Sequence, residues 1–285
     1  MTILCLHHND SDGRASGAIV RYALGSQVQL FEIDYGEPVP WERIQVAERV
    51  IIVDYSLSIL EMQRIAADHE LIWIDHHISA IQALGELSNS IAGIRDISAA
   101  GCVLCWRFFF PDQPLPTAII LIGDRDIWRQ AEPDSPAFNE GLIHEHTQPD
   151  NDALWLPLLK NEPIAIQKLI NKGKILLEAR LVAIRRQVTR FGYQVGFEGH
   201  RTLAINRAGD GDLGHHMLSL GYEIAYCYVD GYQNNQLTTF VTLYANEVDV
   251  SVIARKFGGG GHRGAAGFSF LRSGTPFPPS ANVQI

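Results

Sequence analysis

The sequence Asp75-His76-His77 follows directly on the apolar run Leu71–Ile74, and this junction constrains the fold more than any other feature of the chain. A short apolar run that ends on a carboxylate and two imidazoles is typical of a buried strand that brings polar groups to a sheet edge. A three-residue match arises easily by chance. The same arrangement, however, recurs three more times in this sequence.

The other apolar runs also lead into acidic or imidazole side chains. They are Ile3–Leu6 before His8, Asp10 and Asp12; Val50–Val53 before Asp54; and Ala118–Ile122 before Asp124 and Asp126. Because the carboxyl ends of parallel strands meet at one edge of a sheet, the runs predict that these polar groups converge there. Such a cluster of carboxylates and imidazoles indicates a metal site.

The candidate ligands combine four carboxylates with two imidazoles: His8, Asp10, Asp12, Asp54, His76 and Asp124. Sets of this kind favour manganese or another six-coordinate ion over structural zinc, which takes four ligands and often thiolate. They are also too many for one ion that keeps positions open for water, so two ions that share a carboxylate fit better. A single Asp at a strand end is more often a helix cap or turn residue, and the ordered recurrence favours the metal interpretation.

Composition narrows the class of protein. With 285 residues, 46% of them hydrophobic and 19% charged, the chain can build one large or two ordinary globular domains. Its net charge of −9 excludes the broad basic surface that grips long nucleic acid. An anionic substrate would have to be short and be met by a local positive site such as bound metal. No run approaches the length of a membrane span, so a soluble cytoplasmic protein is expected.

The first part of the chain, to about residue 150, alternates short apolar runs with helix-like segments. This pattern predicts a parallel sheet with crossover helices. One helix is expected over 13–24, and another begins at the capping box Ser58-x-x-Glu61.

A further helix is expected over 99–110, and it carries the pair Cys102 and Cys105. No second pair completes a zinc site, so these cysteines are interpreted as core residues rather than ligands or a redox pair.

The rest of the chain predicts a connector and a second, smaller α/β domain. Apolar residues at helical spacing from Glu162 to about Gln187 indicate a long connector helix. Beyond it, strands are expected at 193–197, 202–206, 223–229 and 236–244, and helices at 213–220 and 249–257. The tail from Ser273 holds three prolines and is expected to be loosely attached.

A glycine run lies in this second domain and consists of Gly258, Gly259, Gly260 and Gly261. Flexible linkers are also glycine-rich, but this run stands between a helix-like segment and the strand-like 265–270. Backbone without side chains lets phosphate approach closely, and His262 and Arg263 would add charge or hydrogen bonds. The run lacks the pattern of a nucleoside triphosphate loop.

The order of these motifs resembles that of the DHH phosphoesterase superfamily. Its four successive motifs are matched by His8-x-Asp10-x-Asp12-Gly13, Asp54, Asp75-His76-His77 and Asp124, and the glycine signature of its DHH-associated C-terminal domain by 258–262. The resemblance spans about 1–270. It implies an α/β protein in which an N-terminal parallel-sheet DHH domain is joined by a long connector helix to a smaller α/β C-terminal domain. The implied parts are the catalytic dimetal domain at 1–155, the helical linker at 156–192, the substrate-binding domain at 193–272 and the tail at 273–285.

The resemblance also implies a role for each residue. His8 and Asp10 would hold one metal, Asp12, His76 and Asp124 the other, and Asp54 would bridge both. Asp75 and His77 would be catalytic, with Asp75 orienting its neighbours and His77 facing the phosphate. The substrate would be bound by Gly258, Gly259, Gly260, Gly261, His262 and Arg263.

Two positions depart from the family pattern. His8 stands where RecJ-like members use aspartate, which points away from that long single-strand exonuclease branch. In the fourth motif, alignment of the preceding apolar run favours Asp124. The following Ile127-Trp128 resembles the Asp-x-Trp form of nanoRNase-like members, and Asp126 stays a second choice.

The expected activity is that of a manganese-dependent phosphodiesterase, with two divalent metal ions, that hydrolyses short single-stranded oligonucleotides (nanoRNA) to mononucleotides. The expected partner is a short oligonucleotide or small nucleotide, not a membrane or a long duplex, and the oligomeric state is open. Rival activities are a 3′,5′-bisphosphate nucleotidase and a cyclic or linear dinucleotide phosphodiesterase. A pyrophosphatase is less favoured, because that branch carries a Lys- and Arg-rich C-terminal signature in place of the glycine run.

Two rivals come from other classes of protein. A nucleotide-binding sensor with an inactive site would lack ligands, yet every expected position is filled. An accessory domain like that of alanyl-tRNA synthetases would explain only the C-terminal third.

Overall fold

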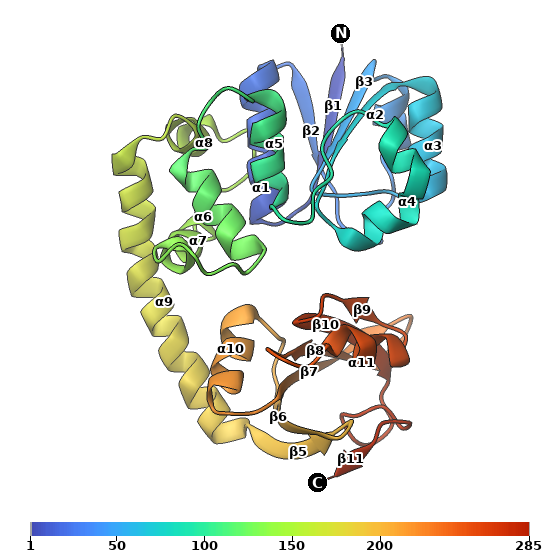
Figure 1. Ribbon diagram of the computed structural model, residues 1–285, viewed down its shortest axis with the longest axis vertical. Coiled ribbons are helices and arrows are strands. Elements are labelled where there is room, and N and C mark those ends of the chain that lie inside the picture. The colour runs from blue at the N-terminus through green and yellow to red at the C-terminus, as the bar shows by residue number, and fades with distance from the viewer. Residues whose placement is uncertain (1, 285) are drawn as a thin grey trace. The chain divides into compact units, whose positions relative to one another are not determined.

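The computed structural model describes residues 2–284, which form two compact units with mixed α/β structure (Figure 1). The first unit extends to Leu177 and the second begins at Glu178. Their boundary lies within α9 (Pro163–Phe191), a helix of 29 residues where the sequence predicts the connector. Across the described residues, no helix is long and apolar enough to cross a membrane.

The first unit is built on a parallel sheet, as the sequence predicts. Its strands lie in the order β2-β1-β3-β4, with bounds β1 (Ile3–His7), β2 (Val28–Glu32), β3 (Arg49–Val53) and β4 (Glu70–Ile74). His7 pairs in register with Val53, and Val53 with Ile74. These three strands therefore end at one edge, so the residues that follow them in the chain emerge side by side.

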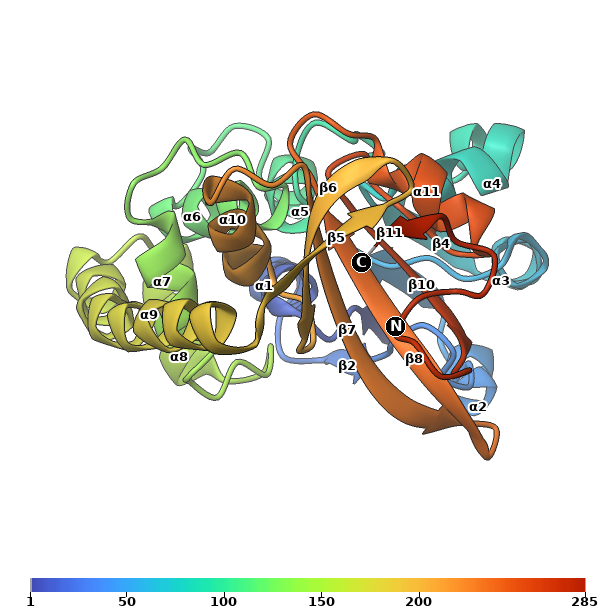
Figure 2. The same ribbon diagram turned by 90° about the horizontal axis from the view of Figure 1, so that it is seen from below.

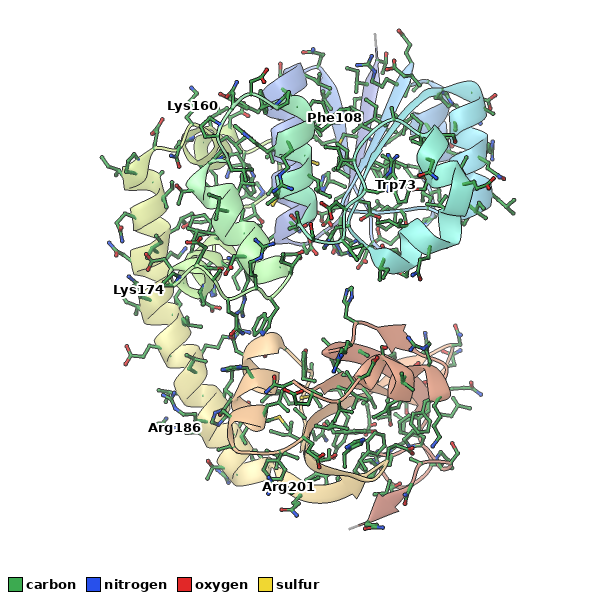
Figure 3. The ribbon with its side chains drawn as sticks, viewed as in Figure 1. Trp73, Phe108, Lys160, Lys174, Arg186 and Arg201 are labelled. Carbon is green, nitrogen blue, oxygen red and sulfur yellow. The ribbon has the colours of Figure 1, made fainter. Side chains whose placement is uncertain are left out.

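Helices cover both faces of this sheet, which is why its central strands carry the continuous apolar runs Ile3–Leu6 and Val50–Val53. One face packs on α1 (Ser11–Leu24) and α5 (Gly101–Phe109). The helices α6 (Thr117–Asp126), α7 (Ser135–Leu142) and α8 (Asp152–Leu159) join the same hydrophobic core beyond them. The other face packs on α2 (Trp41–Gln45), α3 (Ile59–Asp68) and α4 (Ile78–Ser90). Phe108 packs on the first side and Trp73 on the second, and both are labelled in Figure 3.

Several local expectations are confirmed. Ser58 caps α3, and Glu61 completes the capping box by accepting from the Ser58 N–H at 2.9 Å. Cys102 and Cys105 are buried free thiols in α5, as expected of core residues.

The expectation of a strand at the fourth apolar run is wrong. Ala118–Ile122 lies inside α6 and forms no strand. Ala118, Ile119 and Leu121 are buried in the core that α6 shares with α1 and α5. A short apolar run has the same pattern in a buried strand and in a buried helix, so periodicity alone did not separate the two.

The second unit is built on one mixed sheet, seen from below in Figure 2. Among residues up to 284 its strand order is β11-β5-β6-β7-β8-β10-β9, with only β6 and β7 parallel. The strands are β5 (Tyr193–Phe197), β6 (His200–Asn206), β7 (Ile224–Gln233), β8 (Gln236–Tyr244), β9 (Gly260–Gly261), β10 (Ala265–Leu271) and β11 (Val283–Gln284). The helices α10 (Gly211–Ser219) and α11 (Val250–Lys256) pack on opposite faces.

The expectation of a loosely attached tail is also wrong, because the tail packs on this unit. Phe277 is buried against Phe197 and Tyr226, and the Tyr226 hydroxyl donates to the Pro276 carbonyl at 2.7 Å. The last strand, β11, pairs with β5 at the sheet edge. An aromatic residue between the prolines thus anchors a segment whose proline content indicated looseness.

Candidate metal centre

The segment after β1 supplies three candidate ligands, two of them before and one within the first turn of α1. Asp10 is the N-cap of this helix, and its Oδ1 accepts from the Gly13 N–H at 2.8 Å. Its other oxygen lies 2.9 Å from His8 Nδ1. The cap therefore fixes the Asp10 carboxylate beside the His8 ring.

Asp12 is buried in the first turn of α1 and is held by a second helix. Its two carboxylate oxygens accept from the N–H groups of Gly101 and Cys102, both at 2.7 Å. These are the first residues of α5, whose N-terminal end carries the positive pole of the helix dipole. The position suits an ionised carboxylate that keeps further lone pairs for a cation.

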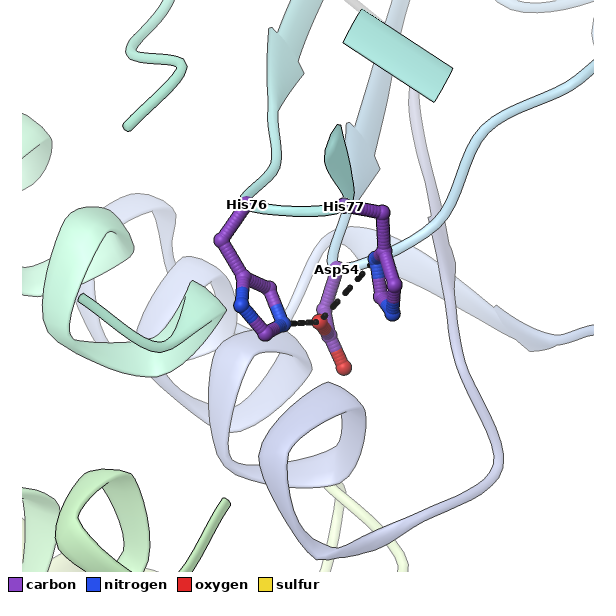
Figure 4. A group of neighbouring side chains, drawn as sticks. All are labelled: Asp54, His76 and His77. Carbon is purple, nitrogen blue, oxygen red and sulfur yellow. Dashed lines mark ion pairs between the residues drawn. The ribbon is translucent and has the colours of Figure 1, made fainter. Parts of the chain in front are cut away.

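Asp54 follows β3 and is 1% exposed. Its φ of +52° lies in the left-handed region, which is uncommon for a residue with a side chain. Its Oδ1 lies 3.1 Å from His76 Nε2, and its Oδ2 lies 3.9 Å from His8 Nδ1. Neither oxygen accepts a hydrogen bond of good geometry within residues 2–284, although both are buried. Figure 4 shows this carboxylate beside the two imidazoles of the motif.

The electrostatic state of Asp54 tests whether a cation fits here. Burial raises the pKa of this carboxyl well above its usual range, and the charges of Asp12, Asp10 and Asp126 raise it further. Like charges crowded around a buried group without a partner are costly unless a counter-charge offsets them. A divalent cation would supply that charge and would use the free oxygens of Asp54. The residues therefore fit a metal.

His76 faces three carboxylates with one ring nitrogen. Besides Asp54, its Nε2 lies 3.5 Å from Asp126 Oδ2 and 3.7 Å from Asp12 Oδ2.

The described residues contain three groups whose possible ligand atoms all lie within 4.8 Å of one another: His8, Asp10, Asp54; Asp12, His76, Asp126; and Asp54, His76, His77. Asp54 and His76 each belong to two of these groups. The groups therefore form one continuous centre, with Asp54 at its middle.

In the fourth motif, Asp126 rather than Asp124 lies among the groups of possible ligands. Asp124 is buried, its Oδ1 accepts from the Ala131 N–H at 2.8 Å, and it belongs to none of these groups of described residues. Side chains two positions apart on a helix point in directions about 200° apart. Asp124 and Asp126 therefore cannot both point toward the centre. Asp124 was favoured because the apolar run before it was expected to be a strand, whereas this run is helical.

Asp75 and His77 form a pair beside the centre. The fully buried Asp75 accepts through Oδ1 from the N–H groups of His76 and His77, at 2.8 and 3.2 Å. The same oxygen lies 2.7 Å from His77 Nδ1. Burial alone would lower the pKa of His77, but the hydrogen bond to Asp75 and its charge outweigh burial and raise it. The pair fixes the ring and leaves Nε2 as its other polar atom.

Three comparisons relate this geometry to known proteins. No family model matches the chain. A curated relative, Uncharacterized protein R106 of Acanthamoeba polyphaga mimivirus, is 29% identical over 234 residues, which cover 78% of this chain and 53% of that protein. The chain thus spans about half the length of this relative.

Solved structures share the fold over most of this chain. A pGpG-specific phosphodiesterase, PggH of Vibrio cholerae, matches with a TM-score of 0.55 and 15% identity over 95% of this chain and 94% of that one. RecJ of Thermus thermophilus, in complex with Mn²⁺, matches with a TM-score of 0.52 and 14% identity over 94% of this chain and 49% of that one. A DHH domain from the s1p family matches with a TM-score of 0.55 and 14% identity over 94% and 82%. The chain shares the fold of these three proteins.

The fold also brings to the centre two residues that the sequence motifs do not mark. Asp34 follows β2, and its Oδ1 lies 3.3 Å from His8 Nε2, the ring nitrogen away from Asp10. Gly101 leaves room for Asp54, because a Cβ at this glycine would lie 2.7 Å from the Asp54 Cβ. Asp34 also comes shortly after a strand, but β2 is an edge strand of mixed polarity and gives no clear apolar run.

The glycine run of the second unit is largely part of the backbone framework. The N–H groups of Gly258 and Gly259 donate to carbonyls of α11, and Gly260 and Gly261 pair with β10 as strand β9. A Cβ at Gly259 would lie 2.0 Å from the Gly267 carbonyl oxygen.

The two residues after the run, His262 and Arg263, are both exposed. An Arg263 guanidinium nitrogen donates to the Glu247 carbonyl at 3.0 Å. The glycine run thus offers fewer free backbone N–H groups to a phosphate than the sequence suggests. The exposed side chains of His262 and Arg263 are the groups that a ligand can reach.

Proposed function

We propose that this protein is a metal-dependent phosphodiesterase that hydrolyses short single-stranded oligonucleotides to mononucleotides. Asp54 carries this proposal, because its two buried oxygens lack hydrogen-bond partners within the described residues and face His8 on one side and His76 on the other. A carboxylate in that state is suited to bridge two cations.

The donor set supports manganese at both positions. His8 and Asp10 would hold one ion, and Asp12, His76 and Asp126 the other, so each ion meets one imidazole and several carboxylate oxygens. Imidazole disfavours magnesium, which prefers oxygen ligands alone. Two such ions, when bound, supply a water nucleophile at neutral pH and neutralise the phosphate oxygens.

The chain's own groups prepare the site for a phosphodiester. Asp75 holds His77 through Nδ1, so Nε2 is free to donate to a phosphate oxygen or to the leaving oxygen. Asp10 and Asp12 are fixed at the N-terminal ends of α1 and α5, so the ligands need little rearrangement on binding.

The substrate is proposed to be short because positive charge on this acidic chain is local. The net charge of −9 opposes a long polyanion, which needs many phosphate contacts. In the second unit, exposed His262 and Arg263 beside the glycine run would bind a terminal phosphate or the nucleotide.

A linear dinucleotide is the second candidate substrate. PggH, described as a pGpG-specific phosphodiesterase, shares the fold over 95% of this chain. A dinucleotide and a longer oligomer present the same phosphodiester to the same centre, so they differ only in what lies beyond the first linkage.

Time-resolved product analysis tests the proposal on four substrates: a labelled RNA 5-mer, a linear dinucleotide, a cyclic dinucleotide and a 3′,5′-bisphosphate nucleotide. Each is incubated with the full chain and manganese, magnesium or a chelator. We expect stepwise release of mononucleotides from the 5-mer, fastest with manganese and absent with chelator. Hydrolysis of the bisphosphate alone would indicate a nucleotidase, and hydrolysis of dinucleotides alone the second candidate. No turnover by protein with bound metal would support a nucleotide sensor.

A further inference from the structure

Tyr35 is an exposed aromatic residue at the edge of the metal centre. Its side chain is 54% exposed, although tyrosine carries a large apolar ring. The ring centroid lies 5.7 Å from that of His8 and 6.5 Å from that of His77. Tyr35 follows the edge strand β2, so it emerges at the same end of the sheet as the ligands. An exposed ring thus lies beside a ligand and beside the imidazole proposed to face phosphate.

The Tyr35 ring is supported from within the unit. The buried ring of Tyr55 lies behind it, with centroids 4.8 Å apart. Tyr55 is in turn stacked against His8 at 6.2 Å, with 20° between the ring planes. The three rings form a continuous aromatic layer whose outer member faces solvent.

The backbone around Tyr35 is also fixed. Its N–H donates to Asp34 Oδ1 at 2.7 Å, and the Asp34 N–H donates to Glu37 Oε2 at 3.0 Å. The Glu37 N–H donates back to the Asp34 carbonyl at 3.1 Å, and Gly36 closes the turn with a φ of +90°. A ring held on such a turn loses little freedom when a ligand stacks on it.

We infer that Tyr35 is a platform on which a nucleobase stacks while the adjoining phosphate lies at the metal centre. This inference rests on the proposed function and adds a base-binding subsite to it. One sugar separates base from phosphate in a nucleotide, so a ring beside His8 and His77 is in reach of the base. Stacking suits every base, because each has a π face. The subsite would distinguish nucleotides from base-free phosphates without selecting a particular base.

An alternative is that Tyr35 only packs against His8 and Tyr55. That role depends on apolar bulk, whereas stacking depends on an aromatic face. Tyr35→Leu keeps bulk and removes the face, and Tyr35→Phe keeps the face and removes only the hydroxyl. Comparing the two variants therefore separates packing from stacking.

Equilibrium binding of AMP and of ribose 5-phosphate, with manganese present, tests the platform by calorimetry. The two probes share sugar and phosphate and differ by the base. We expect the parent and Tyr35→Phe to bind AMP about tenfold more tightly than ribose 5-phosphate. Tyr35→Leu should lose that preference while binding ribose 5-phosphate and manganese as the parent does. Tyr232→Leu, which alters an exposed tyrosine of the β7–β8 hairpin, should keep it.

Other outcomes overturn the platform. Equal weakening of both probes by Tyr35→Leu, with loss of manganese, would show that Tyr35 only packs on His8. An unchanged preference for AMP would place the base elsewhere. Because binding is measured without turnover, the platform can fail while the oligonucleotide assay succeeds, and the reverse also holds.

Discussion

The two units hold their candidate functional residues in opposite ways. In the first, Asp12, Asp54 and Asp75 are at most 1% exposed and are bound or crowded by neighbouring groups. In the second, His262 and Arg263 are exposed, and the glycines beside them serve the connection from α11 through β9 to β10. A buried carboxylate needs a compensating partner, so its position alone indicates a function. An exposed cation is stable in water anyway, so its position indicates far less.

The greatest effect should come from Asp54→Asn, which tests the buried side of this comparison. We expect hydrolysis to fall by at least about a thousandfold, more than removal of one transition-state hydrogen bond typically costs. Bound metal should fall at both positions, since Asp54 faces His8 and His76 at once. Metal content per chain and single-turnover rates measure the two effects. Two tightly bound ions in the variant would contradict the bridging role.

The same variant should be more stable than the parent when both are metal-free. Burial and the charges of Asp12 and Asp10 raise the pKa of Asp54 in the folded state, so its ionised form destabilises the fold near neutral pH. Asparagine carries no charge and should raise the melting temperature of chelated protein. The difference should narrow as pH falls through the raised pKa, because Asp54 then takes up a proton. A lower melting temperature at neutral pH would mean that the charge is compensated without metal.

The next largest effect should separate Asp126→Asn from Asp124→Asn. Asp126 lies 3.5 Å from His76, whereas Asp124 accepts from the Ala131 N–H, a bond that an asparagine oxygen can also accept. Changing a partner of a ligand costs 10–100-fold, so removing a ligand, as Asp126 is proposed to be, should cost at least about a hundredfold. Asp124→Asn should keep its metal and most of its activity. The reverse result, read from metal content and kcat, would restore Asp124 as the ligand.

Asp124 and Asp126 also show which parts of the fold and the site can be predicted from the sequence. Strands β1, β3 and β4 and the polar groups after them follow from apolar runs that end on Asp or His. The fold class and the second unit's main strands follow too, because their patterns are local. The helical state of Ala118–Ile122 depends on packing against α1 and α5, which local periodicity does not encode. The sequence therefore favours Asp124 and keeps Asp126 as a second choice, whereas Asp126 is the one that lies among the possible ligands.

Other site residues were missed because nothing local marks them. The missing side chain of Gly101 matters because Asp54, far away in the chain, comes within 2.7 Å of where its Cβ would be. Asp34 and Tyr35 follow an edge strand whose burial is mixed, so no apolar run points to them. Contacts of this kind join segments that are distant in the chain, so local sequence patterns do not predict them.

A smaller effect, on stability, should distinguish two neighbouring glycines of the second unit. A Cβ at Gly259 would lie 2.0 Å from the Gly267 carbonyl oxygen, whereas a Cβ at Gly260 would meet nothing within 4 Å. Forced overpacking costs about 1–3 kcal/mol, so Gly259→Ala should lower the free energy of unfolding by that amount. Gly260→Ala should be nearly neutral. Chemical denaturation of the full chain measures both, and equal effects would contradict the steric role of Gly259.

The smallest effect should come from the exposed side of the comparison, through His262→Ala and Arg263→Ala. If these residues bind substrate, each variant should keep its metal and should raise KM for short oligonucleotides by about tenfold, the scale of one charge-assisted hydrogen bond. A nitrophenyl phosphodiester, too small to need a second contact, should be hydrolysed almost as by the parent. Arg255→Ala removes the same charge from α11 and serves as the control.

Two results would revise the role of His262 and Arg263. Equal loss on the oligonucleotide and on the nitrophenyl ester would make them part of the chemical site, so that the second unit also carries catalytic groups. No loss on either substrate would leave the glycine run as a tight connection between α11 and β10, with the side chains after it exposed to solvent. We expect the selective loss, because the metal centre itself recognises only the phosphodiester, and contacts beyond it are needed to hold the rest of a short chain.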